Sequence, residues 1–327
     1  MNYFDYNTVW RADNLPDGLI FKDGVTTGTP TTAGTYTVPV TVSNSLGSDT
    51  KNVTIIVKGE NDCSVLVDGA LSETITPTQL QASIQDGTAQ SKYDCSRTQL
   101  VITAVDPRTG DFFDCTLNFA GFRNVTLQDG STKQGLILQT AHPLWRGVAP
   151  FDTNGFNRWK YSNLRRWLNS AGADWFSKAY DTDALTAREG TYSDSGTVGF
   201  LDCLPAGVVE LLQPVKVVTL AFFDDENTDF SIEDPEDLDG YDGDVTYDKV
   251  FIPSLSEMNI PHEDSFEGEA WDVRPSALDL DGNECIMLTR SALTTGKNKI
   301  FALANFSTLE SDTFGTLLAP APAFVIC

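Results

Sequence analysis

Two alternating segments near the N-terminus constrain the fold of this chain more than any other feature. Residues 35–42 (TYTVPVTV) and 52–57 (NVTIIV) alternate with a period of two, and the turn-forming residues 44–48 (NSLGS) separate them. Such alternation is typical of strands with one buried face, and a short turn containing Asn and Gly joins two of them into a hairpin. The sequence therefore predicts antiparallel β-structure for the N-terminal part.

The length of 327 residues predicts more than one domain. We expect a first domain over residues 1–58, a linker over 59–62, and a second domain over 63–327. The second domain mixes predicted strands with predicted helices. The strands are expected at 65–67, 100–105, 116–119, 136–138, 215–220 and 249–252, and the helices at 76–84, 161–169 and 205–212.

Glycine and proline positions in the first domain follow a regular spacing. The pattern is Trp10-x4-Leu15-Pro16-Asp17-Gly18-Leu19, then Gly24-Val25-x2-Gly28-Thr29-Pro30-x3-Gly34-Thr35-Tyr36. It resembles the Putative Ig family, whose modules recur in bacterial surface proteins and phage virion proteins. The resemblance covers residues 3–57 and implies an Ig-like β-sandwich.

Members of that family usually carry one or two strands before the position of Trp10, and this sequence has little chain there. We therefore expect the N-terminal strands of the sandwich to be missing. An open sheet edge is a template for pairing with another strand. We hypothesise that a virion structural protein or a second copy of the chain completes the sandwich.

The second domain carries its own series of motifs. They are Ser162-Asn163-Leu164-Arg165-x-Trp167-Leu168-Asn169, Gly199-Phe200-Leu201-Asp202-x-Leu204-Pro205, residues 248–257 (DKVFIPSLSE), Arg290-Ser291 and the terminal residues 321–325 (APAFV). They resemble an uncharacterised domain of secreted and virion proteins of gut bacteria and their phages. That domain resembles the C-type-lectin and sulfatase-activator architecture. The expected fold class is multidomain: an all-β Ig-like sandwich plus an α+β C-type-lectin-like domain.

Composition excludes several classes of partner. A formal net charge of −24 disfavours nucleic acid and anionic membranes, because contacts with phosphates need clusters of Lys and Arg. No apolar run is long enough to span a membrane, and residues 1–14 lack the basic and apolar regions of a secretory signal. The six cysteines form no C-x-x-C pair, so we expect buried thiols, with a Cys95–Cys115 bridge left open as an alternative.

The sequence predicts that the chain is not an enzyme. His142 and His262 are its two histidines, and both lie beside prolines in expected loops. No nucleophile elbow, Walker loop or dinucleotide-binding glycine motif is present. Sulfatase-activating enzymes need a close pair of redox cysteines, whereas Cys285 and Cys327 are far apart in sequence.

An acidic insertion at residues 224–248 contains twelve Asp and Glu and no Lys or Arg. Calcium binds six to eight oxygen ligands in loops that glycine allows to curl, so calcium is the candidate cofactor. The carboxylates at alternate positions around glycines are Asp237, Asp239, Asp242 and Asp244. Residues 279–284 (DLDGNE) repeat the pattern on a smaller scale, and a solvated acidic surface is the alternative for both segments.

Two loop tryptophans are the candidate ligand-binding residues. Trp145 with Arg146, and Trp271 with Asp272, lie in segments rich in Pro and Gly. Such a tryptophan can stack on a sugar ring while its polar neighbour binds the hydroxyl groups, or it can plug the loop against the sheet.

Three functions follow from these features. The leading hypothesis is a phage virion surface protein, such as a capsid decoration, fibre or tail accessory, whose outer domain binds host-surface glycans. The first alternative is a fragment of a bacterial cell-surface adhesin. The second is an enzyme of unknown type.

Overall fold

The computed structural model describes residues 8–57, 59, 61–145, 159–175, 197–219, 244–260, 267–292, 299–304, 307–312 and 318–327. The chain divides into two compact units, Met1–Asp62 and Cys63–Cys327. Strands dominate both units, and the described helices are short. None of these helices has the length and apolar character that a membrane span requires.

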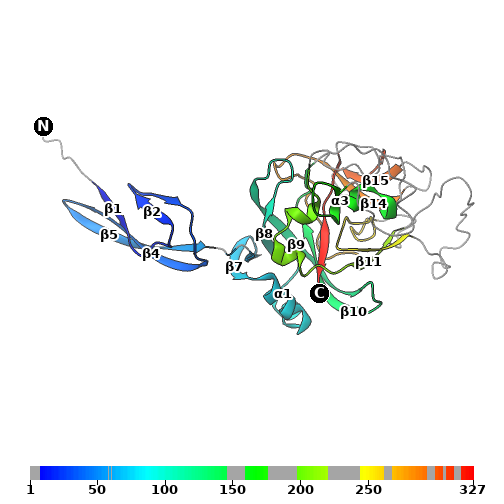
Figure 1. Cartoon of the computed structure of the whole chain (residues 1–327), viewed down its shortest axis with the longest axis horizontal. Helices are drawn as coiled ribbons and strands as arrows, with labels where there is room; N and C mark the ends of the chain where they lie inside the picture. Colours follow the sequence, from blue (N-terminus) through cyan, green and yellow to red (C-terminus); the bar gives the residue numbers. More distant parts are fainter. Residues whose placement is uncertain are drawn as a thin grey trace, which may run out of the picture. The chain divides into compact units, whose positions relative to one another are not determined.

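Two antiparallel sheets form the described part of the first unit (Figure 1). One sheet has the order β1-β4-β5, with β1 at Val9–Ala12, β4 at Gly34–Asn44 and β5 at Gly47–Val57. The other pairs β2 (Leu19–Lys22) with β3 (Val25–Gly28). The predicted hairpin is confirmed, because β4 and β5 pair along their whole length around a two-residue turn.

Two glycines of the spaced pattern allow the backbone to pass close to itself. A Cβ atom on Gly18 would lie 2.1 Å from the Thr29 carbonyl oxygen, and one on Gly28 would lie 2.2 Å from the Gly18 carbonyl oxygen. Both glycines also have positive φ angles, of 90° and 112°. Any side chain at either position would therefore clash with backbone as well as strain it.

The second unit is centred on an antiparallel sheet. Its described strands have the order β13-β18-β10-β9-β8-β6-β7. In chain order these are β6 (Cys63–Val67), β7 (Ala70–Ile75), β8 (Thr98–Val105), β9 (Phe112–Thr126), β10 (Thr132–Thr140), β13 (Val250–Phe251) and β18 (Ala323–Ile326). The strand β18, drawn in red in Figure 1, lies inside the sheet between β13 and β10 and is fully buried.

Further strands flank this sheet. The order β16-β15-β14-β17 describes a second sheet, and β11 pairs with β12 in a third. Their bounds are β11 (Val215–Thr219), β12 (Asp244–Asp248), β14 (Ile286–Ala292), β15 (Lys299–Ala304), β16 (Ser307–Asp312) and β17 (Leu318–Ala319).

Helix α1 (Pro77–Gln85) confirms the predicted N-terminal cap. The Thr76 side chain accepts a hydrogen bond from the Gln79 backbone, and the Gln79 side chain accepts one from the Thr76 N–H. This reciprocal pair is a capping box, and Pro77 begins the helix without losing an intrahelical bond. Helix α2 (Thr88–Lys92) follows directly.

Helix α3 (Asn163–Leu168) also begins as predicted, with the Ser162 side chain accepting from the Arg165 N–H. All six of its residues are buried, including Arg165 and Arg166, so it has no solvent-exposed face. Asp248 of β12 compensates the charge of Arg165 at 2.6 Å and also accepts from the Trp159 indole at 2.8 Å.

The predicted helix at 205–212 is shorter in the structure, where α4 spans Ala206–Val209. Two β-branched valines at its end disfavour continuation. Leu212 instead forms a β-bridge with Ile326 of the central sheet. The short 3₁₀ helices η1 (Trp159–Tyr161) and η3 (Phe200–Cys203) complete the described helical segments.

All six cysteines are free thiols, so the Cys95–Cys115 bridge does not form. Burial raises the pKa of the Cys115 thiol, to about 12. This thiol therefore packs as a neutral, apolar group in the core.

Candidate binding pocket

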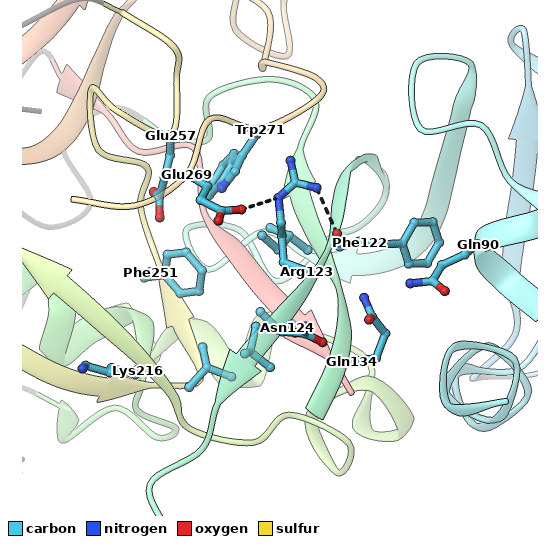
Figure 2. Close-up of a pocket in the computed structure, with 14 residues that line it drawn as sticks. Gln90, Phe122, Arg123, Asn124, Gln134, Lys216, Phe251, Glu257, Glu269 and Trp271 are labelled. Carbon is cyan, nitrogen blue, oxygen red and sulfur yellow. Dashed lines mark hydrogen bonds and ion pairs between the residues drawn. The ribbon is translucent and has the colours of Figure 1, made fainter. Parts of the chain in front are cut away.

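A cavity of about 640 Å³ opens in the second unit, over the face of the central sheet formed by β9, β10, β18 and β13. Apolar side chains from these strands and β11 supply much of its lining: Phe122, Val125, Ile137, Val215, Phe251 and Val325. Polar side chains reach it from six separate segments: Gln90, Arg123, Asn124, Gln134, Lys216, Glu257 and Glu269. Figure 2 shows these groups around Arg123, with Trp271 beside it.

Several hydrogen bonds hold the side chain of Arg123 on β9. Its Nη2 donates to the Ala270 carbonyl at 2.9 Å and to Asp272 Oδ1 at 3.0 Å, and its Nη1 donates to the Phe122 carbonyl at 2.9 Å. Its Nε lies 3.4 Å from Glu269 Oε2, an ion pair drawn in Figure 2. The side chain retains 25% of its exposure, so the guanidinium is fixed yet accessible.

Two consecutive residues anchor the loop that carries Trp271, one to the turn after β13 and one to β9. The Trp271 N–H donates to the Glu257 carbonyl at 2.8 Å, and the Asp272 N–H donates to the Ala120 carbonyl at 2.7 Å. The Trp271 ring meets Phe251 edge to face, with centroids 6.3 Å apart. The tryptophan is 6% exposed, so a limited part of its indole reaches the cavity.

A buried ion pair supports the wall of the pocket behind this loop. Arg290 donates from Nη1 to Glu257 Oε2 at 2.5 Å and from Nη2 to Glu257 Oε1 at 2.8 Å. The same guanidinium donates to the Ile252 and Glu267 carbonyls at 2.6 and 2.7 Å. A bidentate pair with these extra bonds fixes both side chains. Glu257 therefore lines the pocket as a fixed side chain whose carboxylate is held by Arg290.

Cys95 lies close to the Arg123–Asp272 pair. Burial, with a further contribution from the negative charge of Asp272, raises the pKa of the Cys95 thiol to about 11. The thiol is therefore protonated at neutral pH, and a protonated thiol is a poor nucleophile.

The two predicted tryptophan sites have different environments. Trp271 lines the pocket, and Asp272 binds Arg123 at its rim. Trp145 is 5% exposed and packs edge to face against Trp167 and Phe200, at 6.3 and 6.2 Å between centroids. The structure thus places Trp145 in the hydrophobic core, packed against residues of α3 and η3. Its neighbour Arg146 lies outside the described residues.

Sequence reasoning missed the charged residues of the pocket lining: Arg123, Lys216, Glu257 and Glu269. Arg123 carried a detectable signal, since it is a lone cation within a predominantly apolar and neutral strand, residues 116–122 and 124–127. The two glutamates had no comparable signal, because other acidic residues lie close to both of them in sequence.

The predicted calcium ligands fall mostly outside the described residues. These are Asp237, Asp239 and Asp242; Asp244 begins β12, and its side chain is not described. The second acidic segment closes a turn: Asp279 Oδ1 accepts from the Asp281 and Asn283 N–H groups at 3.0 and 2.9 Å. Within the described residues, no three His, Cys, Asp or Glu side chains gather as a metal site would require.

His142 lies in a loop, with its Nδ1 3.0 Å from the Leu278 carbonyl, and His262 is outside the described part of the chain.

Residues 3–58 match the family model described as Putative Ig domain. Comparison with curated proteins and with solved structures gives no match. The Ig-like assignment therefore applies to the first unit alone.

Proposed function

We propose that this chain is a non-enzymatic surface-recognition protein whose second unit binds a glycan in the pocket around Arg123 and Trp271. The main support is the combination of a fixed, accessible guanidinium with carboxylates and amides above an apolar floor. Ligand pockets typically pair an apolar lining with a few well-placed polar groups that set orientation.

The balance of charge in the pocket favours a neutral, hydroxyl-rich ligand. Arg123 pairs with Glu269 and Asp272, and Glu257 pairs with Arg290. Most charges of the pocket are therefore compensated, which favours neither a polyanion nor a polycation. A sugar hydroxyl both donates and accepts, which lets it bridge a guanidinium and a carboxylate. The C–H face of a sugar ring fits the apolar lining of the pocket, to which Phe122, Phe251 and Trp271 contribute.

The proposed setting is the surface of a phage virion, with a bacterial cell surface as the alternative. The Ig-like first unit supports this setting, because such modules recur on both kinds of surface. The motifs of the second unit resemble a C-type-lectin-like domain, which is the fold we propose for it. The genes next to this one separate the two settings: capsid and tail genes support a virion.

A glycan array probed with the purified full-length chain tests the binding function. We expect a small set of neutral oligosaccharides to bind. Replacing Glu269 by Gln or Asn124 by Ala removes one pocket group each, and we expect each change to weaken binding about tenfold. Both residues are exposed, so the fold is expected to survive either change.

The matched control is Asp111→Asn, an exposed carboxylate change outside the pocket, which we expect to leave binding unchanged. An array on which wild type binds no glycan, or on which all three variants bind like wild type, would overturn the proposal.

A further inference from the structure

The strand β5 forms an open edge among the described strands of the first unit. It lies at the end of the order β1-β4-β5, so its described partner is β4 alone. It is eleven residues long, and every residue from Gly47 to Thr54 is exposed. A long, exposed edge strand presents unpaired N–H and C=O groups to any strand that fits beside it.

The two-residue turn sets which backbone groups of β5 face outward. Asn44 pairs with Gly47 across this turn, so Gly47 begins the ladder to β4. Residues on an antiparallel edge strand alternate between bonding inward and facing outward. Ser48, Thr50 and Asn52 therefore direct their N–H and C=O groups away from β4.

One face of β5 carries a charged pair and an apolar side chain. Val53, Lys51 and Asp49 lie opposite Val38, Val40 and Val42 of β4, on the face whose Val38 is buried. Val53 is nevertheless 45% exposed. Asp49 and Lys51 are exposed and make no described ion pair.

We propose that β5 pairs antiparallel with β5 of a second copy, about a two-fold axis at Thr50. In this register Asp49 lies opposite Lys51 of the other copy, and the reverse pair forms symmetrically. Both pairs occupy positions without backbone hydrogen bonds, where opposing side chains are closest.

The same register gives Val53 a place to pack. Val53 of one copy lies opposite Gly47 of the other, where a Cβ atom would meet nothing within 4 Å. A shallow groove of about 320 Å³ borders Gly47 and is lined by Val42, Leu46 and Asp49 among others. The exposed valine of each copy therefore fits beside the groove of the other.

The charges of Asp49 and Lys51 favour a second copy of the chain as the partner of β5. A charged pair on an edge strand opposes pairing with apolar strands, which is a common protection against aggregation. An antiparallel copy is the strand that brings opposite charges to both positions. Residues 1–58 carry five acids and four bases of a chain with net charge −24, so the unit that makes this contact has little net charge of its own.

Sedimentation velocity of the full-length chain, with paired charge reversals, tests this interface. We expect wild type to dimerise reversibly. Asp49→Lys and Lys51→Asp each place like charges opposite one another, and we expect each variant alone to dimerise at least about tenfold more weakly. An equimolar mixture of the two variants restores opposite charges, and we expect it to form heterodimers with an affinity near that of wild type.

Lys22→Asp, an exposed reversal on β2, is the control and is expected to dimerise like wild type. Hydrogen exchange at Ser48, Thr50 and Asn52 is expected to slow on dimerisation. A wild-type chain that stays monomeric at every concentration, or a mixture that remains monomeric while each variant is folded, would refute the proposal.

Discussion

Replacing Glu257 by Gln should strongly destabilise the second unit. The carboxylate faces the guanidinium of Arg290, which is 1% exposed, through two bonds of 2.5 and 2.8 Å. A glutamine side chain keeps the shape of glutamate but removes the charge that compensates Arg290. It also places its NH₂ group, a donor, against the N–H donors of the guanidinium. Removing one partner of a buried pair costs about 3–5 kcal/mol, because the remaining charge stays buried.

Urea unfolding followed by tryptophan fluorescence measures this loss. Five of the six tryptophans lie in the second unit: Trp145, Trp159, Trp167, Trp175 and Trp271. With a slope of about 3 kcal/mol/M, the midpoint should fall by about 1 M or more.

Glu269→Gln is the matched comparison, because it is the same chemical change in the same pocket. The Glu269 side chain is 86% exposed, and its pair with Arg123 is 3.4 Å long. A surface pair of this kind contributes little, so the change should cost no more than about 0.5 kcal/mol. Equal costs for the two variants would contradict the reasoning that burial decides the value of these carboxylates.

Four further predictions concern the core, the thiols and a helix cap. Trp145→Ala should destabilise the second unit by about 3–5 kcal/mol in the same urea assay, because it empties a packed aromatic cluster. The thiols of Cys95, Cys115 and Cys203, with pKa values raised to about 11, 12 and 12 by burial, should react with a thiol reagent at pH 8 slowly when native and readily in urea. In the folded protein these pKa values lie above the ordinary 9.0, so folding favours the neutral thiols. The stability that the neutral thiols contribute is complete below about pH 9, and it should be lost as the pH rises toward 11–12. Urea unfolding repeated across this pH range measures the loss. Thr76→Ala removes the capping box and should cost about 1 kcal/mol by thermal unfolding.

Local patterns predicted the local structure well. The period of two in residues 35–42 and 52–57 specifies a hairpin whose register follows from its short turn. The Thr76 and Ser162 caps place two helix starts, because a cap uses side chains within three residues of the backbone it satisfies.

Features that depend on distant segments were not predictable in the same way. Arg165 looks like a solvent-facing residue of an amphipathic helix, yet Asp248, which lies far along the chain, allows its burial. Trp145 and Trp271 occupy similar loops and are both buried, and their sequences do not tell which of them borders the pocket. The pocket joins β9, the segment after β13 and the Trp271 loop, so its composition emerges from the tertiary fold.

The buried position of β18 determines when the second unit can fold during synthesis. The strand fills the gap between β13 and β10, although it lies near the end of the sequence and β10 lies before its middle. The central sheet of a nascent chain therefore stays split until residues 323–326 leave the ribosome. The first unit, built on a local hairpin, can form much earlier. A growing chain thus displays a finished Ig-like unit while its pocket, with Val325 in its lining, is still absent.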